Sequence, residues 1–334
     1  MRSVVVHEHG GPEVLCLSES DRPDPGPGEV LVRVAAAGVN FIDIYQRSGA
    51  YPMALPYVVG SEAAGTVEQV GPDVSNAQVG DRIAWASVPG SGACEFASVP
   101  VDQAVPVPDQ VELSVAAAVM LQGMTAHYLC ESTFAAAHGH VALVHAAAGG
   151  VGLLLTQMLT AKGVRVIGTT SSDAKEGLAR TAGAAHVVRY RSVDNDDAST
   201  SSDGGLVEQV RDLTDGAGVD VVYDGVGQAT FADGLSVLKP RGTMVLFGAA
   251  SGPVSPIDPQ DLNAAGSVYL TRPKLGDYLQ DRDELLWRAG DVLRGVEIGT
   301  LSVKIGGTYP LEEVAEAHRD LAAGGTSGKL VVLP

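Results

Sequence analysis

The sequence predicts an α/β protein that combines a doubly wound parallel sheet with a β-rich, barrel-like domain. Residues 1 to about 110 consist of short strand-like runs separated by turns. Strand and helix patterns then alternate from residue 141 to residue 247, as in parallel α/β folds. A glycine-rich turn at residues 147–152 joins the first strand of this second region to its helix.

Composition and charge narrow the classes of function. A length of 334 residues corresponds to about two domains. The 22 Lys and Arg against 40 Asp and Glu give a net charge of −18, which repels nucleic-acid phosphates and anionic lipid headgroups. Three widely spaced cysteines fit neither a disulfide framework nor a CxxC zinc pattern. The most apolar run, near residues 141–155, is too short to cross a bilayer. We expect a soluble, cytoplasmic protein with no nucleic-acid partner and no membrane insertion.

The first region is predicted to be β-rich because its apolar runs are short and bounded by turn residues. Residues 29–34, 64–70 and 81–86 contain β-branched side chains in partial alternation, with glycine or proline beside them. Residues 23–28 (PDPGPG) cannot be helical and form a stiff loop. Several short strands of this kind favour a barrel.

The second region is predicted to fold into βαβ units with right-handed crossovers. The expected strands are residues 141–145, 164–167, 186–190, 219–223 and 243–247, and the expected helices are residues 151–162, 173–181, 206–214 and 230–238. A solvated loop is expected at residues 194–205. Past residue 265 we expect a strand at 267–271, a helix at 277–293 and a helix followed by a strand within 311–333.

Residues 147–152 (AAGGVG) match the dinucleotide-binding fingerprint G-x-G-x-x-G, with alanine at the first glycine. The turn follows a predicted strand and opens a predicted helix, which is the context that the fingerprint requires. Gly149 lets the backbone approach a pyrophosphate without an intervening Cβ, and Gly152 lets the helix pack closely on the strand. The free N–H groups of the helix start then face the phosphates. A glycine-rich turn without a ligand is the alternative.

The residues after the second strand bear on which dinucleotide binds. An NAD site places a carboxylate about 20 residues past the glycines, where it binds the ribose 2′-hydroxyl. Here the segment GTTSS offers the hydroxyls of Thr170 and Ser171 and no acid, and Lys175 follows. Tyr190, between two arginines, ends the neighbouring strand. Hydroxyls and a cation suit the 2′-phosphate of NADPH, although Asp173 leaves NADH as an alternative.

Several further segments complete a pattern that runs over essentially the whole chain. They are residues 9–15 (HGGPEVL), 38–45 (GVNFIDIY), 47–49 (RSG), 51–52 (YP), 145–152 (HAAAGGVG), 222–227 (VYDGVG) and 269–273 (YLTRP). Together they resemble the quinone oxidoreductase (zeta-crystallin-like) branch of the zinc-independent medium-chain dehydrogenases/reductases. The resemblance implies a GroES-like β-barrel domain from residues 1–124 and 265–334, and a Rossmann domain from residues 125–264 that binds NADPH. It also implies a homodimer, paired through edge strands of the Rossmann sheets.

The glycine turn and the resemblance together predict which residues contact NADPH. They are Asn40, Thr125, Ala148, Gly149, Gly150, Val151, Gly152, Thr170, Ser171, Lys175, Tyr190, Gly225, Phe247, Gly248, Thr271 and Arg272. The sequence departs from the family pattern in two places. The acidic loop at 194–205 looks longer than usual and could displace Tyr190. Gly225 stands where some relatives have serine, which removes a hydroxyl contact.

The resemblance also bears on metal binding. Zinc alcohol dehydrogenases of the same superfamily carry a Cys ligand, a Gly-His-Glu segment and a four-cysteine lobe. Here Ser61 replaces that histidine, Asn40 lies near the position of the Cys ligand, and the sequence has no cysteine lobe. Zinc requires four suitable ligands in a tetrahedron. We therefore expect no bound metal and a structural role for Glu62.

Without a metal, a nucleophile–base pair or paired acids, the nicotinamide must carry the chemistry. The expected activity is metal-independent electron or hydride transfer from NADPH to quinones, by a one- or two-electron route. Tyr45 and Tyr51 in the motif loop are the candidate donors to the substrate oxygen, and Asn40 would place the ribose or nicotinamide. Two alternatives are an NADPH-dependent enoyl or enone double-bond reductase, with the same tyrosines as proton donors, and a non-enzymatic NADPH-binding protein.

Overall fold

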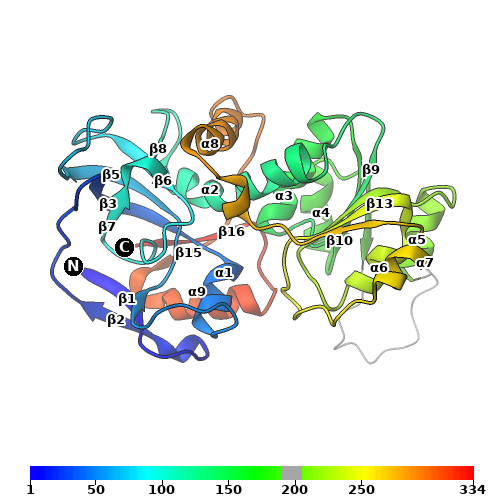
Figure 1. Ribbon diagram of the computed structural model, residues 1–334, viewed down its shortest axis with the longest axis horizontal. Coiled ribbons are helices and arrows are strands. Elements are labelled where there is room, and N and C mark those ends of the chain that lie inside the picture. The colour runs from blue at the N-terminus through cyan, green and yellow to red at the C-terminus, as the bar shows by residue number, and fades with distance from the viewer. Residues whose placement is uncertain (190–204) are drawn as a thin grey trace. The chain divides into compact units, whose positions relative to one another are not determined.

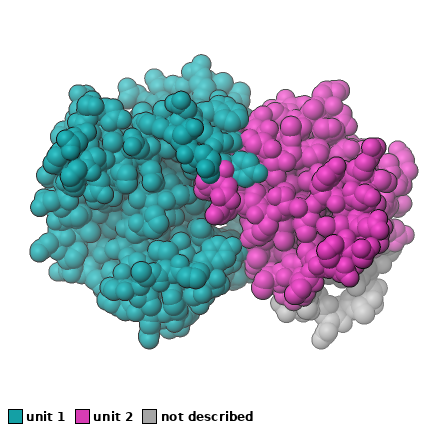
Figure 2. Space-filling view, in the orientation of Figure 1, with its two compact units in different colours: residues 1–124, 278–334 teal, residues 125–277 magenta. Residues whose placement is uncertain are grey.

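The computed structural model describes residues 1–189 and 205–334, so Tyr190 and nearly all of the acidic loop lie outside the described residues. The described chain divides into two compact units (Figure 2). Unit 1 contains residues 1–124 and 278–334, and unit 2 contains residues 125–277. The predicted fold class is confirmed, because unit 1 is built on a mainly antiparallel sheet and unit 2 on a parallel one (Figure 1).

Unit 1 contains a seven-stranded sheet in the order β15-β16-β3-β5-β6-β8, with β7 paired to β3, and a smaller sheet in the order β2-β1-β4. The strands are β1 (Arg2–Val6), β2 (Leu15–Glu19), β3 (Glu29–Val39), β4 (Tyr57–Val58), β5 (Ala63–Val70), β6 (Arg82–Trp85), β7 (Phe96–Pro100), β8 (Val105–Pro106), β15 (Ile305–Pro310) and β16 (Lys329–Leu333). Val30, Val32 and Val34 of β3 enter one core with side chains of β5, β6 and β16. This alternation follows from the two-residue period of a strand.

The helices of this part of the chain are α1 (Phe41–Arg47), α2 (Leu113–Tyr128), which continues into unit 2, α8 (Arg282–Glu297) and α9 (Val314–Ala322). The sequence did not predict α1: Tyr45, expected in a loop, lies on this helix. The helix forms because Asp43 accepts a hydrogen bond from the backbone N–H of Asn40, at 2.8 Å, and so closes its first turn. The predicted helix at 277–293 instead begins at Arg282, because the Asp281 side chain caps it.

Unit 2 contains a six-stranded parallel sheet in the order β11-β10-β9-β12-β13-β14, the doubly wound order 3-2-1-4-5-6. The strands are β9 (Val141–Val144), β10 (Arg165–Thr170), β11 (His186–Arg189), β12 (Val219–Asp224), β13 (Leu238–Leu246) and β14 (Tyr269–Thr271). The helices are α3 (Gly150–Ala161), α4 (Asp173–Thr181), α5 (Leu206–Leu213), α6 (Phe231–Ser236) and α7 (Pro259–Ala264), of which α7 was not predicted. Because all six strands run parallel, their carboxyl ends meet at one edge.

Unit 2 extends to Asp277, whereas the predicted Rossmann domain ends at residue 264. The reason is β14, whose residues Tyr269 to Thr271 add a parallel strand to the edge of β13. The predicted domain limits stay a prediction.

One helical segment, Leu113–Thr133, is by length and composition apolar enough to cross a membrane. It comprises α2 and the short π-helical turn that follows. Seventy-two per cent of its apolar window is buried inside the protein, which is the pattern of a core helix.

Two glycines in helices of unit 2 differ sharply in their surroundings. At Gly152 in α3, a Cβ would lie 2.3 Å from the carbonyl oxygen of Ala146 and 2.8 Å from Cα of Ala147. At Gly177 in α4, a Cβ would meet open space. The absence of a side chain at Gly152 therefore sets how closely α3 packs on the end of β9.

We predict that Gly152→Ala destabilises the protein by about 1–3 kcal/mol, because the new methyl group overpacks backbone that cannot yield. Gly177→Ala, the matched control, should stabilise it by roughly 0.5–1 kcal/mol through helix propensity. Urea unfolding followed by circular dichroism measures both changes. Equal shifts in the two variants would refute the close-packing interpretation.

Asp43 is a buried carboxylate whose pKa departs from its ordinary value. Burial raises the pKa to about 7, against the opposing effects of the Asn40 N–H and of Lys329, and Glu62 raises it further. An unfolded aspartate has a pKa of about 3.9. Between these two values the folded protein holds a proton that the unfolded chain releases. The contribution of Asp43 to stability is therefore complete below about pH 4 and is lost as the pH rises through about 7.

Asp43→Asn should remove this dependence. The free energy of unfolding of the variant should rise relative to that of the wild type by about 4 kcal/mol between pH 4 and pH 8. Chemical denaturation of both proteins across that range measures the difference. A wild-type-minus-variant curve that is flat, or that slopes upward with pH, would contradict the raised pKa.

Candidate functional site

The turn between β9 and α3 is held by its own backbone. The N–H of Gly149 donates to the carbonyl of Ala146 at 2.8 Å, and Ala146 adopts a left-handed φ of 51°. Gly149 is the N-cap of α3 and has no side chain that could cap the helix. A Cβ there would lie 3.2 Å from the Ala146 oxygen and meet nothing else within 4 Å. The first N–H groups of α3 are thus left for a ligand, as anion-binding helix starts require.

Other predicted contacts lie at the carboxyl ends of neighbouring strands of unit 2. Gly225 follows β12, Phe247 and Gly248 follow β13, and Thr271 ends β14 with Arg272 next to it. The Phe247 ring lies over Gly225, where a Cβ would come within 2.8 Å of it. A side chain at position 225, where some relatives in the resembled family have serine, would therefore require the Phe247 ring to shift. The strand ends form the edge at which α/β sheets bind ligands.

The end of β10 carries the hydroxyl groups expected for the ribose side of a dinucleotide. Thr170 is 1% exposed, and its Oγ1 is buried with no hydrogen-bond partner among the described residues. Ser171 is exposed and follows it. Half-buried Lys175 lies in the first turn of α4, and burial lowers the pKa of its ammonium. A bound nucleotide would supply a partner for this hydroxyl, which has none among the described residues.

Asp173 is the acidic residue that left NADH as an alternative cofactor, and in the structure its carboxylate forms an ion pair. Its carboxylate forms an ion pair with the guanidinium of Arg189, whose residue is aligned with Thr170 across β10 and β11. Arg189 also lies 3.4 Å from Glu176. The negative charge of Asp173 is therefore offset by a cation from the adjacent strand.

The other residues predicted to contact NADPH have these locations in the structure. Ala148 is 2% exposed within the glycine turn, followed by Gly150 and Val151 at the start of α3. Thr125 is buried in α2. Tyr190 lies outside the described residues.

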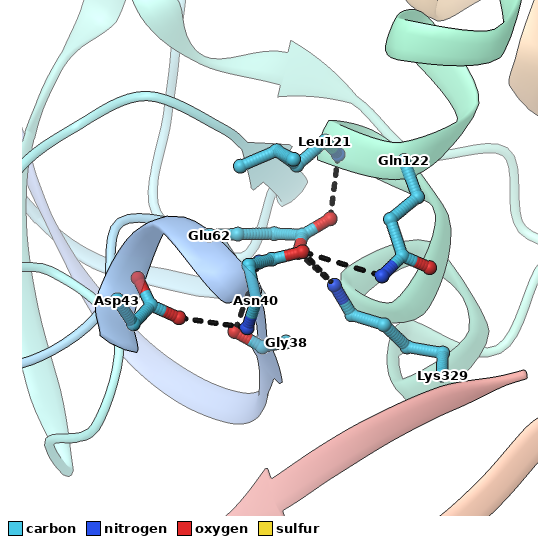
Figure 3. Close-up of polar contacts among 7 residues, drawn as sticks. All are labelled: Gly38, Asn40, Asp43, Glu62, Leu121, Gln122 and Lys329. Atoms are coloured by element: carbon cyan, nitrogen blue, oxygen red, sulfur yellow. Dashed lines mark hydrogen bonds and ion pairs between the residues drawn. The ribbon is translucent and has the colours of Figure 1, made fainter. Parts of the chain in front are cut away.

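Asn40 belongs to a buried polar cluster in unit 1 (Figure 3). Its Nδ2 donates to Oε2 of Glu62 at 2.7 Å, and its Oδ1 accepts from Nζ of Lys329 at 2.6 Å. Gln122 Nε2 donates to the same Oδ1 at 3.4 Å. Lys329 Nζ and Glu62 Oε2 are 2.5 Å apart, and both side chains are almost fully buried. The Asn40 amide is therefore already engaged on both of its ends.

Tyr45 and Tyr51, the candidate donors, lie together in unit 1. Their ring centroids are 5.2 Å apart, and the N–H of Tyr51 donates to the carbonyl of Tyr45. Phe41, one turn earlier on α1, lies 6.2 Å from the Tyr45 ring. Tyr51 is 42% exposed, so its ring is accessible to a small molecule.

The residues of the cluster do not fit a zinc ion. The place between Asn40 and Glu62 is taken by the ammonium of Lys329, a cation that already satisfies both oxygens. Ser61, at the position of the histidine ligand in the zinc enzymes, offers only a hydroxyl. Within residues 1–189 and 205–334, no group of three or more His, Cys, Asp or Glu side chains is placed to hold a metal.

Lys329 is the member of this buried cluster that the sequence did not predict. The only local signal was a lysine opening the otherwise apolar strand KLVVL. Its partners Asn40 and Glu62 are 289 and 267 residues away in sequence, so no local pattern could identify them.

Comparisons with known proteins agree with this architecture. The family described as alcohol dehydrogenase GroES-like domain matches residues 26–132, and the family described as zinc-binding dehydrogenase matches residues 150–278. A quinone oxidoreductase from Pseudomonas aeruginosa is 42% identical over 98% of this chain and 97% of its own length. A 2-haloacrylate reductase from a Burkholderia species is 37% identical over 99% and 98%.

A solved mycobacterial structure, a complex with NADPH, superposes on this chain with a TM-score of 0.93. The two sequences are 48% identical, and the match covers 100% of both chains. Agreement of this extent covers both units and every segment on which the sequence resemblance rested. The chain therefore belongs to the quinone oxidoreductase family of the medium-chain dehydrogenase/reductase superfamily.

Proposed function

We propose that the protein is an NADPH:quinone oxidoreductase that works without a metal. The observation that carries this proposal is the side-chain-free helix start at Gly149, which leaves N–H groups for a pyrophosphate. The Pseudomonas relative is named for quinone reduction, and the mycobacterial neighbour holds NADPH. The NADPH in that neighbour agrees with the polar groups at the strand ends of unit 2.

The residues of unit 2 would hold the cofactor by complementary polarity. The N–H groups of Gly150 and Val151 would face the pyrophosphate, and Thr170 Oγ1 would gain the partner that it lacks within residues 1–189 and 205–334. Lys175 would bind the 2′-phosphate, while the pairing of Asp173 with Arg189 limits repulsion of that phosphate. The other residues predicted from the sequence to contact NADPH remain proposed cofactor contacts. When bound, the reduced nicotinamide supplies the reducing equivalents.

The residues of unit 1 would act on the acceptor. Tyr45 and Tyr51 carry hydroxyl groups that could donate hydrogen bonds to an oxygen that gains negative charge on reduction. Asn40 remains a proposed cofactor contact. Because its amide is held by Glu62 and Lys329, its larger contribution would be to fix the start of α1.

A second candidate function is reduction of the C=C bond of an activated alkene such as an enone. The 37% identical relative named 2-haloacrylate reductase favours it. Such a reaction needs a proton donor for the carbon, and Tyr45 or Tyr51 could serve. An NADPH-binding protein without catalytic activity is the remaining alternative.

The cysteines, the net charge and an exposed edge strand bear on the location and assembly of the protein. None of the three cysteines forms a disulfide, and the net charge is −18. Both features suit a cytoplasmic protein, related to the zeta-crystallins, without nucleic-acid or membrane partners. Edge strand β14 exposes Tyr269 to 64%, which suits a homodimer paired through this edge.

A steady-state screen of NADPH oxidation tests the proposed function directly. 1,4-Benzoquinone, an enone and an enoyl thioester are compared at matched concentrations. We expect kcat/KM to be highest for the quinone. A preference for the enone or the thioester would establish the second candidate, and NADPH binding without turnover of any acceptor would reject both.

Lys175→Ala should raise the KM for NADPH about tenfold or more, because a charged hydrogen bond to the phosphate contributes roughly 1.5–3 kcal/mol. The KM for NADH, which lacks that phosphate, should barely change. Lys162→Ala is the matched control, since Lys162 follows the last turn of α3 and pairs with Glu131. Equal effects of Lys175→Ala on the two cofactors would refute the phosphate assignment.

A further inference from the structure

Lys329 places a full positive charge in the interior of unit 1, and the proposed chemistry gives it no direct use. Its side chain is 1% exposed, and that of its partner Glu62 is 0% exposed. An ion pair this deeply buried seldom adds net stability, because the desolvation of both charges offsets their attraction. We therefore consider whether the pair fixes the positions of its neighbours, because some buried polar groups serve to specify one conformation.

The surroundings of the pair leave it little freedom to move (Figure 3). Glu62 Oε1 accepts from the backbone N–H of Leu121 in α2 at 2.6 Å, while its Oε2 faces Lys329 and Asn40. On strand β3, a Cβ at Gly38 would lie 2.3 Å from Glu62 Oε2 and 2.7 Å from Cε of Lys329. The carboxylate and the ammonium are thus fixed by backbone on two sides.

This fixed pair determines the orientation of the Asn40 amide. Oδ1 must face the ammonium of Lys329, which only donates, and Nδ2 must face the carboxylate of Glu62, which only accepts. Exchanging the two ends of the amide would break both hydrogen bonds. Asn40 therefore has one orientation, and Lys329 enforces it.

Asn40 in turn defines where α1 begins. It is the N-cap residue, and its backbone N–H is bonded to Asp43 of the same helix. Asp43 and Arg47 are buried, whereas Phe41 and Tyr45 are partly exposed and carry the ring contacts with each other. A shift of the N-cap would therefore move the ring of Tyr45.

We propose that Lys329 is a positioning residue for the reductase activity: its ammonium fixes Asn40 and, through Asn40, the start of α1 and the ring of Tyr45. The inference rests on the proposed function. Lys329 donates no proton to the substrate, because its ammonium is buried and bonded to Glu62 and Asn40.

The test compares stability with activity in four variants and one control variant. Lys329→Met keeps the stem of the side chain and removes the charge, and Lys329→Met with Glu62→Gln removes both charges. Asn40→Ala and the double variant Asn40→Ala with Lys329→Met complete a double-mutant cycle. Lys304→Met, at an exposed position of the same unit, is the matched control. Binding of 2′,5′-ADP, which carries only the adenosine part of the cofactor, checks that unit 2 is intact.

We expect Lys329→Met to lose thermal stability and to lower kcat/KM for 1,4-benzoquinone at least tenfold, mainly through kcat. Glu62→Gln in addition should restore the unfolding midpoint but leave kcat/KM at least tenfold below the wild type. Asn40→Ala should make the Lys329 substitution nearly silent in kcat/KM. The affinity for 2′,5′-ADP should stay within twofold of wild type throughout, and Lys304→Met should match the wild type.

A charge-free variant that regains wild-type kcat/KM together with its stability would show that the pair is only structural and would overturn the proposal. Additive losses in the cycle would show that Lys329 does not act through Asn40. If Lys329→Met alone does not fold, the charge-free variant decides. A wild-type protein inactive toward every quinone would instead reject the proposed function, which separates the two failures.

Discussion

The organisation of unit 2 depends on a steric constraint at the junction of β9 and α3. The chain turns back on itself at Ala146, and α3 can pack there only because Gly152 has no side chain. The same bare stretch leaves the first N–H groups of α3 uncapped at Gly149. One backbone geometry therefore serves both the fold and the phosphate site, with Gly152 needed for packing and Gly149 kept open for a ligand.

In unit 1, the short helix α1 carries Tyr45. Seven residues are too few for an isolated helix to be stable in water. Tertiary contacts hold α1 instead: Asp43 closes its first turn, Arg47 is buried with His318, and Asn40 is fixed by the buried ion pair. The ammonium of Lys329 occupies the place between Asn40 and Glu62. This ammonium holds the side chains of Asn40 and Glu62 in place and, unlike a metal ion, offers no open coordination position.

The sequence predicted what depends on local pattern. The parallel sheet followed from the alternation of strand and helix, and the glycine turn followed from its spacing and context. The sequence did not predict features that depend on tertiary contacts or on a capping side chain. Helix α1 lies in a β-rich region with no helical period, and α8 begins late because Asp281 caps it. The pairing of Lys329 with Glu62 joins the last strand of the chain to its first third, so only the folded structure could reveal it.

The affinity of NADPH for the Gly149→Val variant, followed by cofactor fluorescence, tests directly whether the bare turn binds the phosphates. Valine fits the extended backbone at this position, and a Cβ meets only the Ala146 oxygen, so the variant should fold. Its side chain would cover the N–H groups that the phosphates need. We expect a folded protein whose affinity for NADPH is about 100-fold weaker or lost, the equivalent of roughly 2.7 kcal/mol or more. Wild-type affinity in a folded Gly149→Val protein would show that the phosphates do not bind at this turn.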